Sequence, residues 1–227
     1  MKPGKWIFTL VAFAVLLLIG MIVAFPLLQP QKKLKVFQPH EINPKLVDES
    51  KRGVRENHSI ADFELINQLG DTIRRSDMEG KIYVADFFFA TCPTICPTMS
   101  SNIASLQNDF ADFPEVAFLS HSVTPDMDSV PVLYEYAERY GARHDVWWLL
   151  TGDKKTIYEL ARKSYFAVLD EGDGGVQDFI HTENFVLVDT KGRLRGFYDG
   201  TDPRDISRLR EEIKILLAEC FPERYKV

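Results

Sequence analysis

A pair of cysteines directly after a long apolar run is the feature that most limits how this chain can fold. Residues 81–90, KIYVADFFFA, are aromatic and β-branched, as in a strand buried on both faces of a sheet. The motif Cys92-Pro-Thr-Ile-Cys96-Pro follows, and apolar residues at helical spacing begin at Met99. We therefore expect the cysteine loop at the carboxyl end of a strand, where ligands gather in open α/β sheets.

The remainder of the chain alternates between short strands and amphipathic helices. A hairpin is predicted over residues 60–75, strands over 116–123, 147–150, 184–189 and 194–198, and helices over 99–110, 130–140, 154–165 and 203–219. Right-handed crossovers make the two central strands parallel and place helices on both faces. Many α/β folds share this βαβ pattern, and the cysteine pair narrows the choice. The predicted class is α/β, a thioredoxin-like mixed sheet flanked by helices, with an N-terminal hairpin extension.

An apolar segment near the N-terminus predicts one transmembrane helix. Residues 6–28 contain no charged side chain and would extend roughly 34 Å as a helix, enough for a hydrocarbon core of ~30 Å. The small-x-small pattern of a cleavable signal is missing around Phe25, which favours an uncleaved anchor. The expected organisation is a cytoplasmic N-terminus (1–5), the anchor (6–28), a tether that partly wraps the domain (29–58) and a thioredoxin-like domain (59–227).

The side of the membrane follows from the position of the apolar segment more than from charge. Lysines precede and follow the segment in nearly equal number, so the positive-inside count is almost balanced. A short N-terminus before a single apolar segment usually stays in the cytoplasm, and no Arg/Ser-rich transit sequence precedes it. We expect a single-pass protein of the bacterial inner membrane with its domain on the extracytoplasmic side.

Composition excludes some functions and isolates the cysteine pair. The net charge is −6 and the body of the chain has no basic cluster, which argues against a nucleic-acid partner. Three cysteines are too few for a disulfide-stapled scaffold, and Cys220 lies far from the other two. The pair therefore predicts chemistry, with simple core packing as the remaining alternative.

Two kinds of chemistry are open to Cys92 and Cys96. Each precedes a proline, which disfavours helical backbone at the cysteine, so the helix is expected to begin near Pro97. A helix N-terminus lowers the pKa of a thiol, and a thiolate is both a nucleophile and a soft metal ligand. The two thiols suit Cu(I) and can also form a disulfide. Three residues separate them, whereas thioredoxin motifs have two, so a dedicated oxidoreductase is less favoured.

His181 is the best candidate for a third ligand. It precedes a strand that should neighbour the cysteine strand, and an imidazole suits Cu(II) better than thiolates alone. A turn or surface role for His181 remains the alternative. His121 lies inside an apolar strand, which favours a core or near-site histidine over a ligand. The other histidines are not expected to bind metal: His40, His58 and His144.

The segment GKIYVADFFFATCPTICPTM, residues 80–99, resembles the Sco/SenC family, copper proteins of cytochrome c oxidase assembly. The resemblance extends over about residues 59–219. It implies copper, as Cu(I) or Cu(II), bound by Cys92, Cys96 and His181, with the cysteines as a redox-active pair. One position departs from the family pattern: Thr124 stands where the family often has an acid, while Asp128 is retained. Asp126 and Asp128 would serve equally well as turn or helix-capping residues.

The resemblance implies a copper metallochaperone that is not an enzyme and delivers copper to the binuclear copper centre of cytochrome c oxidase. Its expected partners are the copper-bearing oxidase subunit, the membrane, and other copper chaperones or thiol reductases. The alternative is a thiol-disulfide reductase that keeps cysteines of the oxidase or of other exported proteins reduced. A peroxiredoxin-type peroxidase is less favoured, because Thr91 is adjacent to Cys92 and no arginine lies near the motif.

Overall fold

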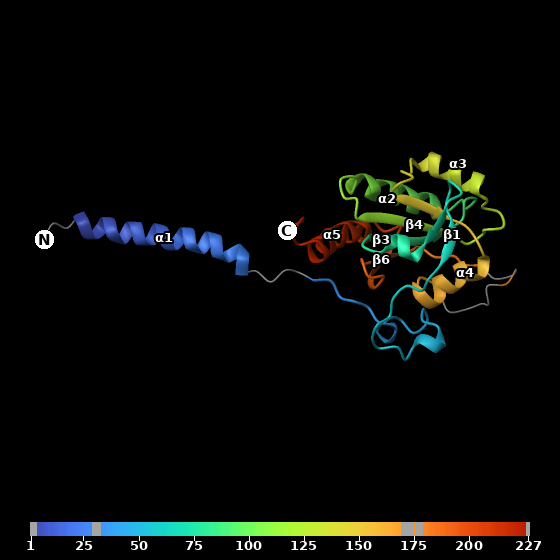
Figure 1. Ribbon diagram of the computed structural model, residues 1–227, viewed down its shortest axis with the longest axis horizontal. Coiled ribbons are helices and arrows are strands. Elements are labelled where there is room, and N and C mark those ends of the chain that lie inside the picture. Colours follow the sequence, from blue (N-terminus) through green and yellow to red (C-terminus); the bar gives the residue numbers. More distant parts are fainter. Residues whose placement is uncertain (1–3, 29–32, 169–174, 176–178, 226–227) are drawn as a thin grey trace. The chain divides into compact units, whose positions relative to one another are not determined.

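The computed structural model describes the chain except for residues 1–3, 29–32, 169–174, 176–178 and 226–227 (Figure 1). It separates into two compact units, Met1–Lys33 and Leu34–Val227. The first contains helix α1 (Gly4–Leu28), whose described side chains, at residue 6 and residues 8–21, are exposed. In the part of the chain that the structure describes, no helix has the length and apolar character needed to cross a membrane.

The second unit is built on a five-stranded sheet in the order β5-β4-β3-β6-β7. The strands are β3 (Ile82–Phe88), β4 (Val116–Ser122), β5 (Trp147–Leu150), β6 (Asn184–Val188) and β7 (Leu194–Asp199). Strands β3, β4 and β5 are mutually parallel, whereas β6 and β7 are antiparallel to their neighbours. Every residue of β3 and β4 is buried, as expected for strands covered on both faces. The predicted thioredoxin-like mixed sheet is confirmed.

Helices cover both faces of this sheet. Helices α2 (Cys96–Asp109), α3 (Val130–Tyr140) and α5 (Pro203–Cys220) pack on one face, which we call the cysteine face because both cysteines of the motif belong to its core. The opposite face is covered by α4 (Lys154–Glu159), by the π-helical turn Leu160–Ser164 and by the N-terminal segment of the unit. The helix predicted over residues 154–165 therefore changes its hydrogen-bond register halfway.

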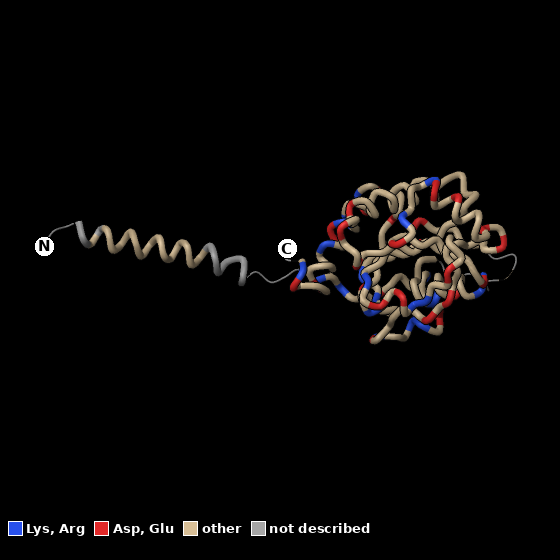
Figure 2. The backbone as a smooth tube through the Cα atoms, turned by 45° about the horizontal axis from the view of Figure 1, so that its top comes forward, with Lys and Arg blue, Asp and Glu red and all other residues tan. Residues whose placement is uncertain are grey.

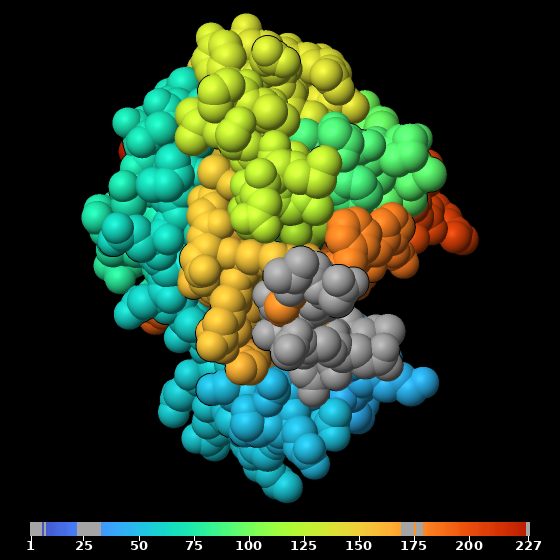
Figure 3. Space-filling view, turned by 90° about the vertical axis from the view of Figure 1, so that its right-hand side faces the viewer, coloured from blue at the N-terminus to red at the C-terminus, as the bar shows by residue number. Residues whose placement is uncertain are grey.

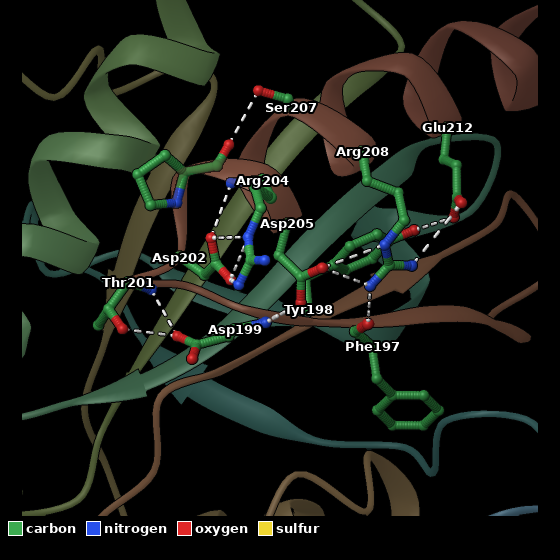
Figure 4. A network of polar contacts seen from close by, with 11 residues as sticks. Phe197, Tyr198, Asp199, Thr201, Asp202, Arg204, Asp205, Ser207, Arg208 and Glu212 are labelled. Carbon is green, nitrogen blue, oxygen red and sulfur yellow. Dashed lines mark hydrogen bonds and ion pairs between the residues drawn. The ribbon is translucent and has the colours of Figure 1, made fainter.

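Helix α5 begins where the sequence predicts, after the cap Asp202 (Figure 4). The Asp202 side chain accepts a hydrogen bond from the Arg204 backbone N–H, which satisfies one of the free donors of the first turn. Along the helix, the Arg208 guanidinium lies 4.1 Å from the centre of the Tyr198 ring and donates to the Phe197 carbonyl of β7. These contacts fix α5 against the edge strand of the sheet.

The compact unit begins at Leu34, earlier than the predicted domain start at residue 59. The buried Arg195 guanidinium donates hydrogen bonds to the carbonyls of Leu34 and Lys35 and pairs with Asp189 and Glu219. Two apolar side chains of the same segment are buried in the core, Ile42 and Val47. Much of the predicted tether therefore packs as part of the domain.

The predicted N-terminal hairpin forms, although its strands are short. β1 (Glu64–Ile66) and β2 (Thr72–Arg74) make a separate two-stranded sheet. The Asn67 side chain accepts hydrogen bonds from the backbone N–H groups of Leu69 and Asp71, which stabilise the turn between the two strands.

Along the backbone of the domain, acidic and basic residues are interspersed (Figure 2).

Candidate metal centre

The cysteine pair lies where β3 gives way to α2. After Phe88 the chain turns, and the Cys92 N–H donates to the Phe89 carbonyl at 3.1 Å. Cys96 is the first residue of α2, and the proline after it is tolerated there because first-turn N–H groups have no partner within the helix. Both thiols are free, and the residues are only 7 % and 2 % exposed. The structure thus confirms the predicted loop between strand and helix.

The two thiols differ in acidity. Burial alone would raise the pKa of Cys92, but hydrogen bonds with the backbone and side chains of Cys96 and Thr94 outweigh burial and lower this pKa to about 7. Burial, with smaller contributions from the hydrogen bond and charge of Cys92, raises the pKa of Cys96 to about 12. Near neutral pH one thiol of the pair therefore ionises while the other keeps its proton.

A buried polar chain lies beneath the pair, on the cysteine face of the sheet. The Ser120 hydroxyl donates to Asp86 Oδ1 at 2.5 Å and accepts a hydrogen bond from Trp147 Nε1 at 2.9 Å. Burial raises the pKa of Asp86 to about 7, and the charge of Asp86 contributes to the high pKa of Cys96. Sequence reasoning missed Asp86, although a single acid inside an apolar strand was a usable signal.

Asp128 holds the other side of the loop. It is 1 % exposed, and its Oδ2 accepts hydrogen bonds from the Ser122 hydroxyl (2.6 Å), the Thr124 hydroxyl (3.0 Å) and the backbone N–H of Ala90 (3.2 Å). Ala90 lies two residues before Cys92. The residue that caps α3 is Ser129, so Asp128 has a role in the loop and not at the helix end.

His181 lies outside the thiol pair, in the segment just before β6. Its neighbours Ile180 and Thr182 are buried toward the opposite face, where the Thr182 hydroxyl donates to the Ala167 carbonyl. Exposed and buried residues therefore alternate here, with His181 on the exposed side. His181 itself is exposed.

The segment before β6 adjoins the cysteine loop. The rings of Phe179 and Phe89 lie 5.2 Å apart in a T-shaped contact. The green surface around residues 90–100 and the orange surface leading into β6 share one face of the molecule (Figure 3). Among the described residues, however, no three His, Cys, Asp or Glu side chains are grouped closely enough to hold a metal ion. The structure therefore brings Cys92 and Cys96 together and does not group His181 with them.

His121 is a core residue, as the sequence favours. It is fully buried, stacks on Phe87 at 5.0 Å and contacts the Asp86 carbonyl through Nδ1 at 3.2 Å. Burial lowers its pKa to about 4. Its side chain packs on the face opposite the cysteines, with Phe63 and Tyr165.

Cys220 is remote from the pair. It ends α5 and receives a long hydrogen bond from the Thr190 hydroxyl, 3.9 Å from oxygen to sulfur, just past the end of β6. Since β6 runs antiparallel to β3, this end of β6 lies away from the cysteine loop. Burial raises the pKa of Cys220.

Two thiols of unequal acidity, held on a buried loop at the end of a parallel strand in this mixed sheet, define a thioredoxin-like dithiol domain. The family model SCO1/SenC matches residues 52–218. The chain belongs to the SCO1/SenC family.

Three solved structures illustrate the relationship. A SCO1/SenC family lipoprotein from Bacillus anthracis is 31% identical, with 70% of this chain and 95% of that chain covered and a TM-score of 0.60. BsSco, described as a member of the Sco family of cytochrome c oxidase assembly proteins with a disulfide switch, is 31% identical, with 70% and 92% covered and a TM-score of 0.60. Copper-bound ScoI from Bradyrhizobium japonicum is 22% identical, with 71% and 100% covered and a TM-score of 0.54, a likeness that shows the fold.

The unequal thiols predict selective alkylation. With a pKa of about 7, Cys92 becomes increasingly ionised as the pH rises through 7, whereas Cys96, at about 12, stays protonated up to much higher pH. Iodoacetamide should therefore modify Cys92 first between about pH 7 and pH 9, since the thiolate is the nucleophile. Peptide mass spectrometry at a series of pH values measures this order. Cys92→Ser should abolish the inflection near pH 7, and faster labelling of Cys96 would contradict the assignment.

Proposed function

We propose that this protein is a copper metallochaperone that delivers copper to the binuclear copper centre of cytochrome c oxidase. Copper is its cargo, held by Cys92, Cys96 and His181 and released by ligand exchange to the copper-bearing oxidase subunit. The observation that carries the proposal is the pair of free, adjacent thiols on the buried loop of a SCO1/SenC protein. The relatives' oxidase assembly role and bound copper support it.

The donor set suits this cargo in both oxidation states. Thiolates are soft ligands that favour Cu(I), and an imidazole nitrogen adds a donor that Cu(II) prefers. A ligand must lose its proton to bind metal. Because the pKa of Cys92 is about 7, this thiol yields its proton readily near neutral pH, whereas binding at Cys96 must displace a firmly held proton.

The second candidate is a thiol-disulfide reductase for cysteines of the oxidase or of other exported proteins. The same unequal pair supports it, because the Cys92 thiolate would attack a target disulfide and Cys96 would then attack the mixed disulfide. The reaction leaves Cys92 and Cys96 oxidised and the target dithiol reduced, so a thiol reductase must supply two electrons for the next cycle. The thiols favour neither role alone, and the His181 test below separates them.

We also propose that residues 6–28, which lack charge, attach the chain to the bacterial inner membrane with the copper domain outside the cytoplasm. The full chain should sediment with membranes and resist an alkaline carbonate wash. A chain beginning at Leu34, the start of the compact unit, should be recovered in the soluble fraction. Release of the full chain by carbonate would contradict the anchor.

The disulfide state should control copper binding. A disulfide between Cys92 and Cys96 consumes both thiolates, so the oxidised protein should bind no Cu(I), whereas the reduced protein should bind it stoichiometrically. The measurement is metal content after gel filtration. Cys220→Ser is the matched control and should leave binding intact; loss of binding in that variant would show that the cysteines are wrongly divided. Failure of the reduced parent to bind copper would remove the metallochaperone proposal.

His181→Ala should retain much of the Cu(I) affinity and lose or strongly alter the sulfur-to-Cu(II) charge-transfer band. The reason is that Cu(I) tolerates two thiolates, while Cu(II) prefers more ligands and a nitrogen donor. Absorption and electron spin resonance spectra measure the change, with His144→Ala as the matched control, since His144 pairs with Gln68 and Glu138. Identical spectra in a folded His181→Ala protein would exclude His181 as a ligand.

The same variant separates the two candidate functions in cells. If metal transfer is the main role, cells that carry His181→Ala should assemble the oxidase poorly. Normal assembly together with an altered Cu(II) spectrum would favour thiol reduction instead.

A further inference from the structure

Asp128 holds the cysteine loop through one carboxyl oxygen, while the other has no partner among the described residues. Its Oδ2 accepts three hydrogen bonds, whereas its Oδ1 is buried and has no partner among the described residues. A buried acceptor without a donor costs free energy, because the hydrogen bonds it made with water are not replaced. Such an atom points to a donor that arrives in another state of the site.

The position of this oxygen limits which donor can arrive. The other oxygen of the same carboxyl group holds the Ala90 N–H, two residues before Cys92, so Oδ1 lies at the edge of the cysteine loop. Ser122, which also donates to Oδ2, belongs to the strand position that faces the cysteine side of the sheet, in alternation with His121 on the opposite side. The spare acceptor therefore lies on the same side of the sheet as the two thiols.

The segment that carries His181 leads into β6 and contacts the cysteine loop. β3 and β6 pair antiparallel from Tyr83–Val188 to Ala85–Val186. Phe179, two residues before His181, packs against Phe89, the residue before Ala90, with ring centroids 5.2 Å apart. His181 is exposed, and no described residue bonds to its ring.

We propose that Asp128 is a positioning residue that accepts, through Oδ1, the second ring N–H of His181 when His181 binds copper. This inference rests on the proposed copper site. Histidines that bind metal commonly donate their other ring N–H to a carboxylate or carbonyl, which fixes the tautomer and the orientation of the ring. Asp128 would then join three parts of the site: the turn after β4, the loop before Cys92 and the imidazole.

Thr124 helps to keep the Oδ1 atom of Asp128 free to accept a hydrogen bond from His181. Its hydroxyl donates to Oδ2 at 3.0 Å, so Oδ2 is saturated by hydroxyl and backbone donors while Oδ1 stays open. An acid at position 124 would place a second negative charge against Asp128, which disfavours two ionised groups at this distance.

A double-mutant cycle on the full chain in detergent micelles, with Cu(II) as the probe, tests the inference. Asp128→Asn keeps one oxygen for the three Oδ2 hydrogen bonds and replaces the free acceptor with an N–H donor. It should weaken Cu(II) binding about 10–100-fold and alter the electron spin resonance spectrum. In a His181→Ala background the same substitution should have little further effect, because the partner ring is already gone.

The controls separate this role from structure alone. Asp126→Asn changes an exposed acid of the same turn and should leave Cu(II) affinity unchanged. Additive losses from Asp128→Asn and His181→Ala would overturn the inference while leaving copper binding established, whereas a parent protein that binds no copper would overturn the proposed function itself.

A second measurement applies even where Asp128→Asn fails to fold. In the parent chain loaded with Cu(II), pulsed electron spin resonance should detect the remote ring nitrogen of His181, as a signal absent from the His181→Ala protein, with a ring N–H that exchanges slowly with deuterium oxide. A rapidly exchanging ring proton in a His181 that is bound to copper would contradict the assignment.

Discussion

The parallel pairing of β3 with β4 is the constraint on which the rest of the domain depends. The pairing runs in unbroken register from Ile82–Val116 to Phe88–Ser122, and every residue of both strands is buried. Buried backbone groups must be paired, so the two strands are fixed relative to each other along their whole length. The carboxyl ends of the two strands lie side by side, because Phe88 pairs with Ser122 and the next N–H, that of Val123, donates to the Phe88 carbonyl at 2.8 Å. The cysteine loop and the turn that carries Asp128 must therefore leave the sheet side by side.

The different burial of the two thiols explains why their pKa values differ so strongly within one short motif. Cys96 begins a helix that packs directly on the sheet, close enough to Asp86 to feel its charge, and burial dominates its pKa. Cys92 lies at the outer turn, where hydrogen bonds from the loop and helix start favour its thiolate. The same asymmetry suits an attacking thiol with a resolving partner and a metal site with one ready ligand. The two proposed functions, copper delivery and thiol reduction, would thus both use the unequal pKa values of the two thiols.

Sequence patterns predicted the parts of the fold that depend on local periodicity. The apolar runs identified the strands of the sheet, and Asp202 with Pro203 marked the start of α5. The start of the compact unit at Leu34 was not predictable, because that segment lacks periodicity and is held by Arg195, about 160 residues away in the chain. Asp86 and Asp128 were underestimated for a related reason: their partners lie on neighbouring strands and turns, and single-sequence patterns do not contain those distances.

The position of His181 connects the sheet topology with the proposed release of copper. β6 is antiparallel to β3, so the start of β6, and not its end, meets the cysteine loop. Under the proposed function the third donor would come from a different segment of the chain, whereas the two thiols belong to one loop. Copper held by the thiols would be shielded by the buried side of the loop and accessible from the side of the exposed His181. Under the proposed function, loss of that one nitrogen lowers the coordination number without disturbing either thiolate. An incoming ligand from the receiving protein can then enter at the same side, so exchange proceeds without releasing the ion into water.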